Sequence, residues 1–300
     1  MGMRLDFITC KCHRGTKTRI AYNFLVPLRL CGRFNKTNMD LQLKDKIIVV
    51  TGGAKGIGEG IVKLLATEGA CPVIVGRSEE DNLKTLKEIE SNNGEAWQVV
   101  AELTEPLECV KAVNAIIKKF GRIEGLVNNA GINDGVGLES GNYEKFMQSL
   151  HRNLVHYYLM AQSCLPELKK TKGAIVNIGS KTAETGQGNT SAYAAANGGR
   201  NAMTREWAVE LLKYDIRVNA VIVAECFTPL YEKWIKTLPD PEKKLKEIES
   251  KIPLGNRMTT AEEIANAVAF LLSPRSSHTT GQLIHVDGGY VHLDRALANA

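Results

Sequence analysis

Short apolar runs alternate with longer segments of helical period from Lys46 onward, and this alternation is the strongest constraint on the fold. Runs that are apolar at every position, rather than at every second one, are typical of strands buried on both faces of a parallel sheet. The sequence therefore predicts an α/β fold with a doubly wound, seven-stranded parallel sheet covered by helices on both faces. The expected strands are 47–50, 73–75, 96–100, 125–128, 174–178, 217–221 and 283–286, and the expected helices are 57–68, 79–91, 106–120, 143–168, 191–212 and 261–272.

Local signals at helix ends support this division of the chain. Gly69 and Gly121 follow two of the expected helices, where a residue with positive φ commonly ends a helix. Thr260 stands three residues before Glu263, which is the spacing of a capping box at a helix N-terminus. No internal repeat or linker divides residues 39–300, so we expect a single domain there.

The first 38 residues differ in charge from the rest of the chain. They hold eight Lys and Arg against one acid, Asp6, a net +7; the other 262 residues therefore hold 30 basic and 32 acidic groups, a net −2. We expect residues 1–38 to be a basic extension that adds little to the core. A transit-type leader is one explanation, and a true start near Met39 is the one we favour.

The remainder of the chain excludes two classes of partner. A mildly acidic body offers no basic face to replace phosphate counterions, so we expect no nucleic-acid partner. No run approaches the roughly 20 apolar residues of a membrane-spanning helix, so we expect a soluble protein without a membrane partner.

The seven cysteines are odd in number and form no CxxC pair. Reduced thiols in a cytoplasmic protein are the simplest interpretation. Cys10, Cys12 and His13 lie close together, but no second ligand pair follows at a suitable spacing. The sequence predicts no metal site.

A glycine-rich turn follows the first expected strand and runs directly into a helix. It is Thr51-Gly52-Gly53-Ala54-Lys55-Gly56-Ile57-Gly58. Glycines allow a tight turn and a close approach of backbone N–H groups to a diphosphate, which the helix N-terminus also attracts. Because this turn stands between a strand and a helix, it predicts dinucleotide binding.

The end of the second expected strand indicates which dinucleotide binds. An acidic residue there would bind the ribose hydroxyls of NAD, but this chain has Gly76-Arg77-Ser78. Arg77 and Lys55 are able to pair with a 2′-phosphate. We therefore expect NADP as the cofactor, with NAD as the alternative. The other interpretation is that Arg77 and Lys55 are ordinary solvated side chains with no role in cofactor binding.

Together these motifs resemble the short-chain dehydrogenase/reductase family over residues 46–289. The chain matches it in TGGAKGIG at Thr51–Gly58, in NNAG at Asn128–Gly131, and at Asn153, Ser180 and Tyr193. The resemblance implies a Rossmann sheet, with Tyr193 as acid/base, Ser180 orienting the substrate oxygen and Asn153 anchoring a water-mediated proton path. It implies cofactor contacts at Gly52, Lys55, Gly56, Ile57, Gly58, Arg77, Glu102, Leu103, Asn129, Ala130, Gly131, Tyr193, Asn197 and Thr228.

The family pattern has a lysine four residues after the tyrosine, and this chain has Asn197 there. A free phenol has a pKa near 10, which a nearby cation lowers by about 1 to 3 units. Without that cation we expect cofactor binding to survive and turnover to be weak at neutral pH, rising towards alkaline pH. Lysine restored at position 197 is expected to raise the rate at least tenfold at pH 7. We interpret Lys181, beside Ser180, as a solvated side chain.

The segment after the sixth expected strand indicates the substrate. Thr228 matches the family there, although the usual Pro-Gly turn before it is missing, and residues 229–253, with Tyr231 and Trp234, resemble the family's mobile substrate lid. Two segments, RVNAVIVAECFTPLYEKWI and SSHTTGQLIHVDGGYVHLDRAL, resemble bacterial members that oxidise L-fucose to its lactone. Glu225 offers a carboxylate to sugar hydroxyls.

These features predict an oxidoreductase acting on a small-molecule substrate, an L-fucose-like aldose. Two alternatives remain open at this stage. One is a family member acting on a ketone, quinone or hydroxysteroid, and the other is a dinucleotide-binding pseudoenzyme that lost catalysis with the lysine. The resemblance of the last strand and turn to the family's pairing region further implies a homodimer or homotetramer.

Overall fold

The computed structural model describes residues 39–293, and within them it confirms the predicted fold. A seven-stranded sheet runs in the order β3-β2-β1-β4-β5-β6-β7, with every neighbouring pair parallel. The expected basic extension, residues 1–38, lies outside the described residues, as do residues 294–300. The strands are β1 (Ile47–Thr51), β2 (Cys71–Gly76), β3 (Trp97–Val100), β4 (Gly125–Asn128), β5 (Ala174–Ser180), β6 (Arg217–Val223) and β7 (Leu283–Val286).

The strand order reverses between β1 and β4, which are neighbours in the sheet although β2 and β3 separate them in sequence. From this point the chain winds outward in both directions, so the loops after β1 and β4 diverge and leave a crevice at the carboxyl ends of the strands. In open α/β sheets this is where ligands bind. The glycine-rich turn follows β1 and the NNAG motif ends β4, so both predicted cofactor motifs meet at the reversal.

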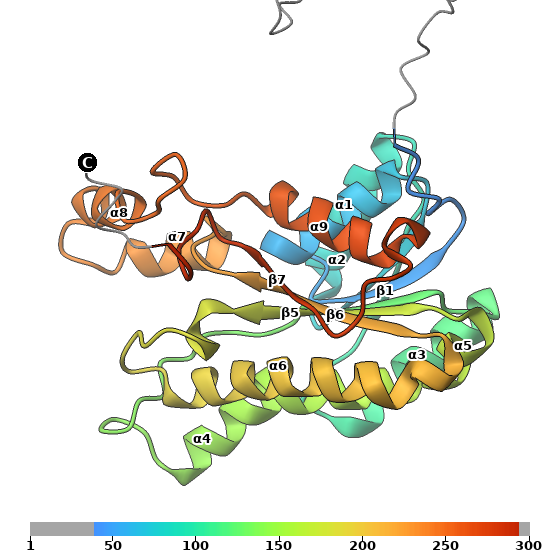
Figure 1. Cartoon of the computed structure of the whole chain (residues 1–300), viewed down its shortest axis with the longest axis horizontal. Helices are drawn as coiled ribbons and strands as arrows, with labels where there is room; N and C mark the ends of the chain where they lie inside the picture. Colours follow the sequence, from blue (N-terminus) through green and yellow to red (C-terminus); the bar gives the residue numbers. More distant parts are fainter. Residues whose placement is uncertain (1–38, 294–300) are drawn as a thin grey trace, which may run out of the picture. The chain divides into compact units, whose positions relative to one another are not determined.

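Helices cover both faces of the sheet, as Figure 1 shows. Helices α1, α2 and α9 lie on one face, and α3, α5 and α6 lie on the other. Alternate residues of each strand belong to two separate cores: Ile48 and Val50 pack with α1 and α9, whereas Ile47 and Val49 pack against the opposite layer. Burial on both faces explains why the strand sequences are apolar throughout. The helices are α1 (Gly56–Thr67), α2 (Glu79–Ser91), α3 (Pro106–Phe120), α4 (Tyr143–Leu150), α5 (His156–Thr171), α6 (Ser191–Leu211), α7 (Pro229–Ile235), α8 (Pro241–Glu249) and α9 (Ala261–Leu272).

The helix expected over residues 143–168 differs from the prediction. A π-helical turn, η1 (His151–Val155), separates α4 from α5. Such turns insert an extra residue into a helix and often occur at functional sites. Here the turn contains Asn153, which is fully buried. The sequence has no Gly or Pro at this point, so nothing in it signalled the interruption.

The helix ends confirm the predicted local signals. Gly69 and Gly121 have φ values of 79° and 72° after the ends of α1 and α3. The Thr260 hydroxyl accepts from the Glu263 amide at 3.1 Å, and the Glu263 carboxylate accepts from the Thr260 amide at 2.9 Å, a complete capping box. Within residues 39–293, no helix combines the length and apolar character that crossing a bilayer requires.

The segment expected to form a lid contains α7 and α8. Each begins with Pro in its first turn after a capping residue, Thr228 for α7 and Asp240 for α8. Their side chains accept from the amides of Tyr231 and Lys243 at 3.2 Å and 3.1 Å. Pro at the first helical position after such a cap is a helix-start signal, so the sequence contained the information for both helices.

Candidate active site

Thr51 joins the turn after β1 to the loop after β4. Its hydroxyl accepts hydrogen bonds from the amides of Asn129 at 2.9 Å and Ala130 at 3.1 Å. In return, the Asn129 side chain donates to the carbonyl oxygens of Thr51 at 2.9 Å and Gly52 at 3.2 Å. The two predicted cofactor motifs are therefore fixed against each other. Thr51 was not singled out as a site residue by the sequence analysis.

Three glycines give the turn its shape. Gly52 and Gly56 have φ values of 64° and 58°, a conformation that L side chains rarely adopt. A Cβ atom on Gly58 would lie 2.1 Å from the Gly52 carbonyl oxygen and 2.6 Å from the side-chain nitrogen Nδ2 of Asn129. The first turn of α1 thus packs directly against the glycine-rich turn, which leaves its backbone N–H groups close to any group in the crevice.

The first turn of α1 keeps backbone donors available. Lys55 is its N-cap residue, and the Lys55 side chain makes no capping hydrogen bond. The unpaired amides of a helix start attract a diphosphate. Ile57 lies half-buried in this turn, and Thr228 lies opposite it, because a Cβ on Gly56 would be 3.2 Å from the Thr228 Cβ. The glycine-rich turn, the first turn of α1 and Thr228 together form a cradle, which fits the diphosphate of a dinucleotide.

The residues predicted to select the dinucleotide follow two neighbouring strands: Lys55 lies in the turn after β1, and Arg77 lies directly after β2. Lys55 pairs with Asp81 at 2.6 Å, and Arg77 lies 3.8 Å from Glu102. Burial opposes ionisation of Glu102, but hydrogen bonds from Thr104 and the charge of Arg77 outweigh it and lower the pKa of this carboxyl. The Arg77 side chain is 79% exposed, whereas Leu103 is buried.

Ser180 and Tyr193 occupy neighbouring elements beyond this crevice. Ser180 ends β5 and is buried. Its hydroxyl oxygen accepts two hydrogen bonds from Thr182, one from the backbone amide at 3.3 Å and one from the side-chain hydroxyl at 3.1 Å. Tyr193 lies in the first turn of α6 and is half-buried. Both therefore stand at the carboxyl-end side of the sheet, on rigid elements rather than on loops.

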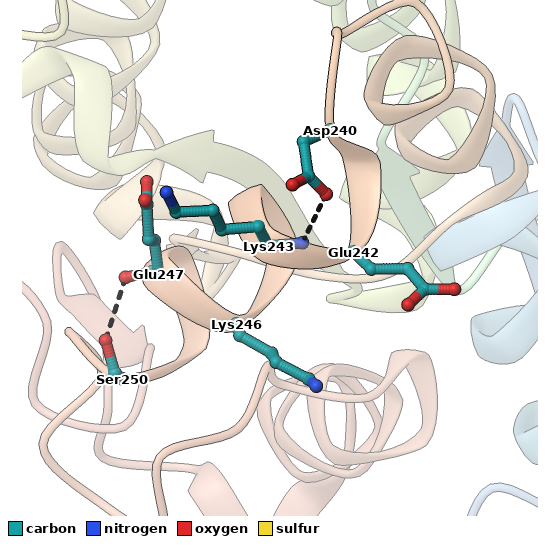
Figure 2. Close-up of a pocket in the computed structure, with 6 residues that line it drawn as sticks. All are labelled: Asp240, Glu242, Lys243, Lys246, Glu247 and Ser250. Atoms are coloured by element: carbon teal, nitrogen blue, oxygen red, sulfur yellow. Dashed lines mark hydrogen bonds between the residues drawn. The ribbon is translucent and has the colours of Figure 1, made fainter.

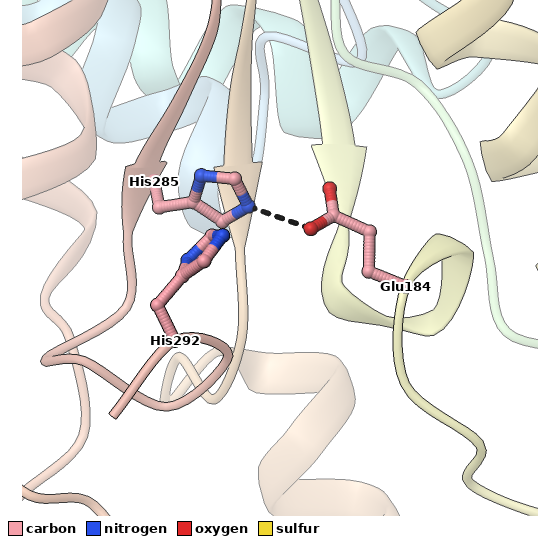
Figure 3. A group of neighbouring side chains, drawn as sticks. All are labelled: Glu184, His285 and His292. Carbon is pink, nitrogen blue, oxygen red and sulfur yellow. Dashed lines mark hydrogen bonds and ion pairs between the residues drawn. The ribbon is translucent and has the colours of Figure 1, made fainter. Parts of the chain in front are cut away.

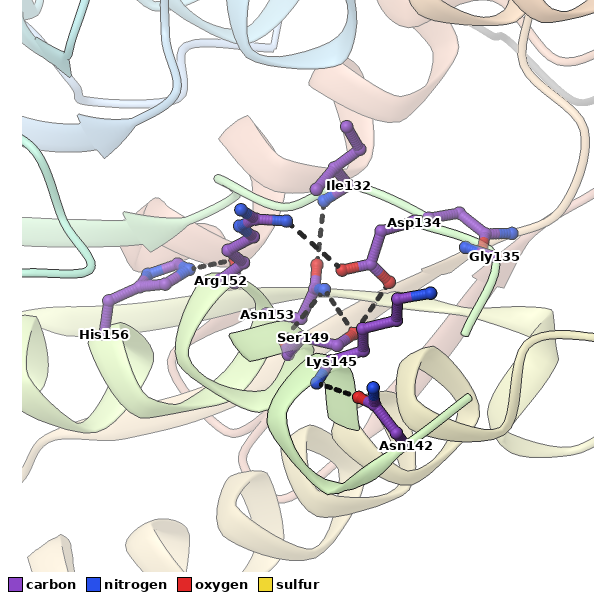
Figure 4. Close-up of polar contacts among 10 residues, drawn as sticks. Ile132, Asp134, Gly135, Asn142, Lys145, Ser149, Arg152, Asn153 and His156 are labelled. Atoms are coloured by element: carbon purple, nitrogen blue, oxygen red, sulfur yellow. Dashed lines mark hydrogen bonds and ion pairs between the residues drawn. The ribbon is translucent and has the colours of Figure 1, made fainter. Parts of the chain in front are cut away.

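Asn153 anchors the loop after β4 to the π-helical turn, as Figure 4 shows. Its side-chain oxygen accepts from the Ile132 amide at 2.8 Å, and its side-chain nitrogen donates to the Ser149 carbonyl at 3.0 Å. The Ser149 hydroxyl donates to Asp134 at 2.8 Å, and Arg152 lies 3.9 Å from the same carboxylate. Asn153 thus holds the chain segment that follows the NNAG motif.

Asn197 is fully buried and faces a cation that the sequence analysis did not consider. Its nitrogen donates to the Tyr193 carbonyl at 2.9 Å, and its oxygen accepts from Arg200 Nη1 at 3.0 Å. Arg200 is only 2% exposed. The available signal was a lone arginine in a run of small residues, NGGRNA, seven residues after Tyr193 and so on the same side of the helix.

The interpretation of Lys181 as a solvated side chain was wrong. Its side chain is 8% exposed, forms a short ion pair with Glu225, and places its nitrogen 4.1 Å from the ring centroid of Tyr290. The residue follows Ser180 directly, and β5 and β6 end side by side with Ser180 opposite Val223. This register brings Glu225 beside Lys181, which no local pattern reveals.

Aromatic side chains continue from this ion pair into α7. The Tyr231 ring lies 6.1 Å from that of Phe227 and 5.1 Å from that of Trp234, between ring centroids. Burial and the neighbouring Glu225 carboxylate raise the pKa of Tyr231, so its hydroxyl stays protonated and donates. Phe227 and Trp234 are each about half exposed, which leaves aromatic faces open beside the charged pair.

Two further features lie away from these residues. The groove in Figure 2, about 550 Å³, runs along α8 and is lined by its charged surface, where Ser250 donates to the Glu247 carbonyl at 3.0 Å. Figure 3 shows Glu184, His285 and His292, whose donor atoms lie within 4.8 Å of one another, a set able to hold a divalent metal ion. His285 already contacts Glu184 at 3.0 Å, so these two groups satisfy each other without an ion.

The sequence matches known proteins over nearly the whole described part. The family model described as enoyl-(acyl carrier protein) reductase matches residues 52–291. The 3-oxoacyl-(acyl-carrier-protein) reductase of Thermotoga maritima is 38% identical over 253 residues, which cover 84% of this chain and 100% of that protein. The L-fucose dehydrogenase of Bos taurus is 32% identical over 252 residues, covering 84% and 91%.

Solved structures share the same fold. The crystal structure of Cj0485 dehydrogenase has a TM-score of 0.82 and 50% sequence identity, and the match covers 86% of this chain and 98% of that one. Actinorhodin polyketide ketoreductase, solved with NADPH, has a TM-score of 0.78 and 27% identity, covering 83% and 98%.

Proposed function

Because this chain belongs to the short-chain dehydrogenase/reductase family of oxidoreductases, we propose that it is an NADP-dependent sugar dehydrogenase. Its substrate is L-fucose or a related aldose, oxidised at the anomeric carbon to the lactone. The observation that carries the substrate class is the buried Lys181–Glu225 pair beside Ser180, with aromatic rings next to it. The similarity to L-fucose dehydrogenase supports the same choice.

A sugar presents several hydroxyls and apolar C–H faces. Hydrogen bonds to charged groups are stronger than those between neutral ones, so a fixed carboxylate and ammonium discriminate well among hydroxyl patterns. The half-exposed rings of Phe227 and Trp234 offer apolar surface beside them. A substrate with a long apolar body would displace water from the buried pair and leave the remaining hydrogen-bonding capacity of the ammonium and the carboxylate unused, which is costly.

The chemistry divides between two side chains. Tyr193, as phenolate, accepts the proton of the anomeric hydroxyl, and Ser180 donates a hydrogen bond that orients the same oxygen. When bound, the nicotinamide accepts the hydride that leaves the anomeric carbon, so the substrate loses one proton and one hydride in total. The proton is held at the Tyr193 oxygen until it exchanges with solvent.

The cofactor is held by the cradle around α1. Amides of the glycine-rich turn bind the diphosphate, and Thr228 closes the cradle opposite Gly56. Family members use NAD(P)(H), and the exposed Arg77 and Lys55 favour NADP. Their partners Asp81 and Glu102 do not prevent this, since exposed ion pairs contribute only about 0 to 1 kcal/mol and yield to a phosphate of greater charge.

The test is absorbance at the reduced-nicotinamide band, with NAD and NADP, across a panel of aldoses. We expect turnover on L-fucose or a stereochemical relative, a loss of at least about a hundredfold in Tyr193→Phe, and a shift towards NAD in Arg77→Glu. Lys118→Glu, a cation on α3 outside the cradle, is the control and keeps the NADP preference. No uptake of either coenzyme in titration calorimetry would refute the proposal.

A second candidate activity is reduction of a ketone. The 38% identity to a 3-oxoacyl-(acyl-carrier-protein) reductase favours it. The same residues serve in reverse, with Tyr193 donating the proton to the carbonyl oxygen. The absorbance assay separates the two activities. A ketone reductase consumes reduced cofactor when a ketone is added, and it produces no reduced cofactor with any aldose of the panel.

We further propose a cytoplasmic homodimer or homotetramer. Four cysteines within residues 39–293 are buried and unpaired, which suits a reducing compartment. Exposed apolar side chains on the outer helices, including Leu107 and Val110 on α3 and Val209 on α6, offer surface for a second copy. Sedimentation equilibrium measures the subunit count.

A further inference from the structure

Arg200 is a buried cation without a carboxylate partner in the described part of the chain. Its Nε donates to the Asn153 carbonyl at 2.6 Å, and its Nη1 donates to the Ile178 carbonyl at 3.1 Å and to Asn197 Oδ1 at 3.0 Å. Its Nη2 has no hydrogen-bond partner within residues 39–293. All three acceptors are neutral, so the guanidinium charge itself is not balanced.

Such an arrangement is costly, and stability alone does not explain it. Removing a charge from water is unfavourable unless an opposite charge compensates, and an apolar residue of similar size at position 200 would avoid the cost. In active sites, fixed donors and charges are aimed at the atoms where the reaction generates the opposite charge. The position of the guanidinium indicates which group that is.

Helix geometry directs Arg200 towards Tyr193. The two residues are seven apart on α6, and long helical side chains lean towards the N-terminus of the helix, which carries the guanidinium back past Asn197. Its central carbon lies 6.0 Å from the centroid of the Tyr193 ring and 4.2 Å from that of Tyr157. The charge therefore lies near both rings, closer to Tyr157 and within 6.0 Å of the ring centroid of the proposed acid/base.

The unpartnered nitrogen faces the cofactor motif. A Cβ atom on Gly131, the last residue of NNAG, would lie 2.9 Å from Arg200 Nη2 and 2.9 Å from Asn153 Oδ1. Only a glycine leaves this space for the guanidinium. Arg200 thus lies against the backbone of the NNAG motif. It also donates to the carbonyl of Asn153, the residue that the family resemblance implied as the anchor of a water-mediated proton path.

We propose that Arg200 is a positioning residue that supplies, from one turn further along α6, the positive charge missing at position 197, and that this charge stabilises the phenolate of Tyr193. The chain is then an active enzyme and not a pseudoenzyme. This inference rests on the proposed oxidoreductase function but not on the identity of the substrate.

The substitution also changes how the charge behaves. A guanidinium stays protonated at every working pH, so it stabilises an anion without passing on a proton, unlike an ammonium group. The titratable groups that face it are Tyr193, Tyr157 and His156. Burial raises the pKa of Tyr157 and lowers the pKa of His156 to about 4, so both remain neutral in the working range. Of the three, Tyr193 is the group that the proposed reaction requires as an anion, and its ring centroid lies 6.0 Å from the guanidinium carbon.

Arg200→Leu tests this through the pH dependence of kcat/KM. An opposite charge within about 4 to 6 Å shifts an ionisation by about 1 to 3 pH units. Because the guanidinium lies 6.0 Å from the ring, we expect the acidic midpoint to rise by about 1 to 2 units and the rate at pH 7 to fall about 10- to 100-fold. Arg200→Lys retains much of the activity, and the exposed Arg205→Leu on the same helix leaves the profile unchanged.

Moving the charge gives a sharper test. The structure changes the expectation for Asn197→Lys: in place of the tenfold gain expected from the sequence alone, this variant gains little, because its ammonium would lie beside the guanidinium and like charges disfavour each other. Asn197→Lys combined with Arg200→Leu restores the rate that Arg200→Leu loses. A tenfold gain from Asn197→Lys alone, or an unchanged pH profile in folded Arg200→Leu, overturns the proposal. Where Arg200→Leu does not fold, Arg200→Gln and the double variant decide.

Tyrosinate absorbance separates this inference from the proposed function, because it needs no turnover. We titrate the coenzyme-saturated wild type, Tyr193→Phe and Arg200→Leu. The ionisation that is missing in Tyr193→Phe is expected to move to higher pH in Arg200→Leu, by about 1 to 2 units. If that ionisation does not move, Arg200 has no such role, even where the sugar assay succeeds. If it moves while every sugar fails, only the substrate assignment is wrong.

Discussion

The buried Lys181–Glu225 pair makes a quantitative prediction about stability. The two side chains are 8% and 13% exposed, so neither has water to replace a lost partner. Breaking a buried pair on one side costs about 3 to 5 kcal/mol, because the remaining charge is uncompensated. We expect Glu225→Gln to lower the free energy of unfolding by about 3 kcal/mol, which corresponds to a Tm lower by roughly 6 to 12 °C.

Removing both charges tests the physical cause. Lys181→Met combined with Glu225→Leu leaves no buried charge, so it is expected to be close to wild type. Because each single substitution costs about 3 kcal/mol, the coupling free energy between the positions is then about 6 kcal/mol. The control is the exposed pair Lys172–Asp215, with side chains 67% and 68% exposed, where Lys172→Met is expected to leave the unfolding midpoint nearly unchanged. The assay is urea unfolding of all variants at one protein concentration, since an oligomer's stability depends on it. Additive effects of the two substitutions, or a cost under about 1 kcal/mol for each, would show that the pair is solvated and the reasoning wrong.

Two further predictions concern other buried groups. Burial lowers the pKa of His156 to about 4, so as the pH falls below 6.5 the unfolded chain binds a proton at this residue before the folded chain does. Urea titrations should therefore show a free energy of unfolding about 2 kcal/mol lower at pH 5 than at pH 7. A decrease of the same size in His156→Asn would contradict this cause. Gly58→Ala places a Cβ 2.1 Å from the Gly52 carbonyl oxygen, so calorimetry should show coenzyme affinity at least about tenfold weaker, whereas Gly198→Ala, with open space around its Cβ, should not weaken it. Equal affinity in Gly58→Ala would mean that the turn is not tightly packed.

The sheet was predictable because its signals are local. Strands buried on both faces require uninterrupted apolar runs, and the runs at 125–128 and 283–286 match β4 and β7 at both ends. Helix boundaries at Gly121 and Thr260 follow from φ preference and side-chain capping, which involve residues one turn apart. The π-helical turn at Asn153 was not predictable, because contacts with distant segments hold it rather than its own sequence.

The sequence by itself determined the fold, the glycine-rich cradle and the absence of lysine at position 197, since each depends on residue type and spacing along one element. Only the tertiary structure decided what surrounds that position. Arg200 contacts Asn153 from a different helix, and the two residues are 47 positions apart in the sequence. Lys181 and Glu225 follow two neighbouring strands and are 44 positions apart. The burial and pairing of a charge depend on which segments pack around it, and packing between distant segments leaves no periodic pattern in the sequence.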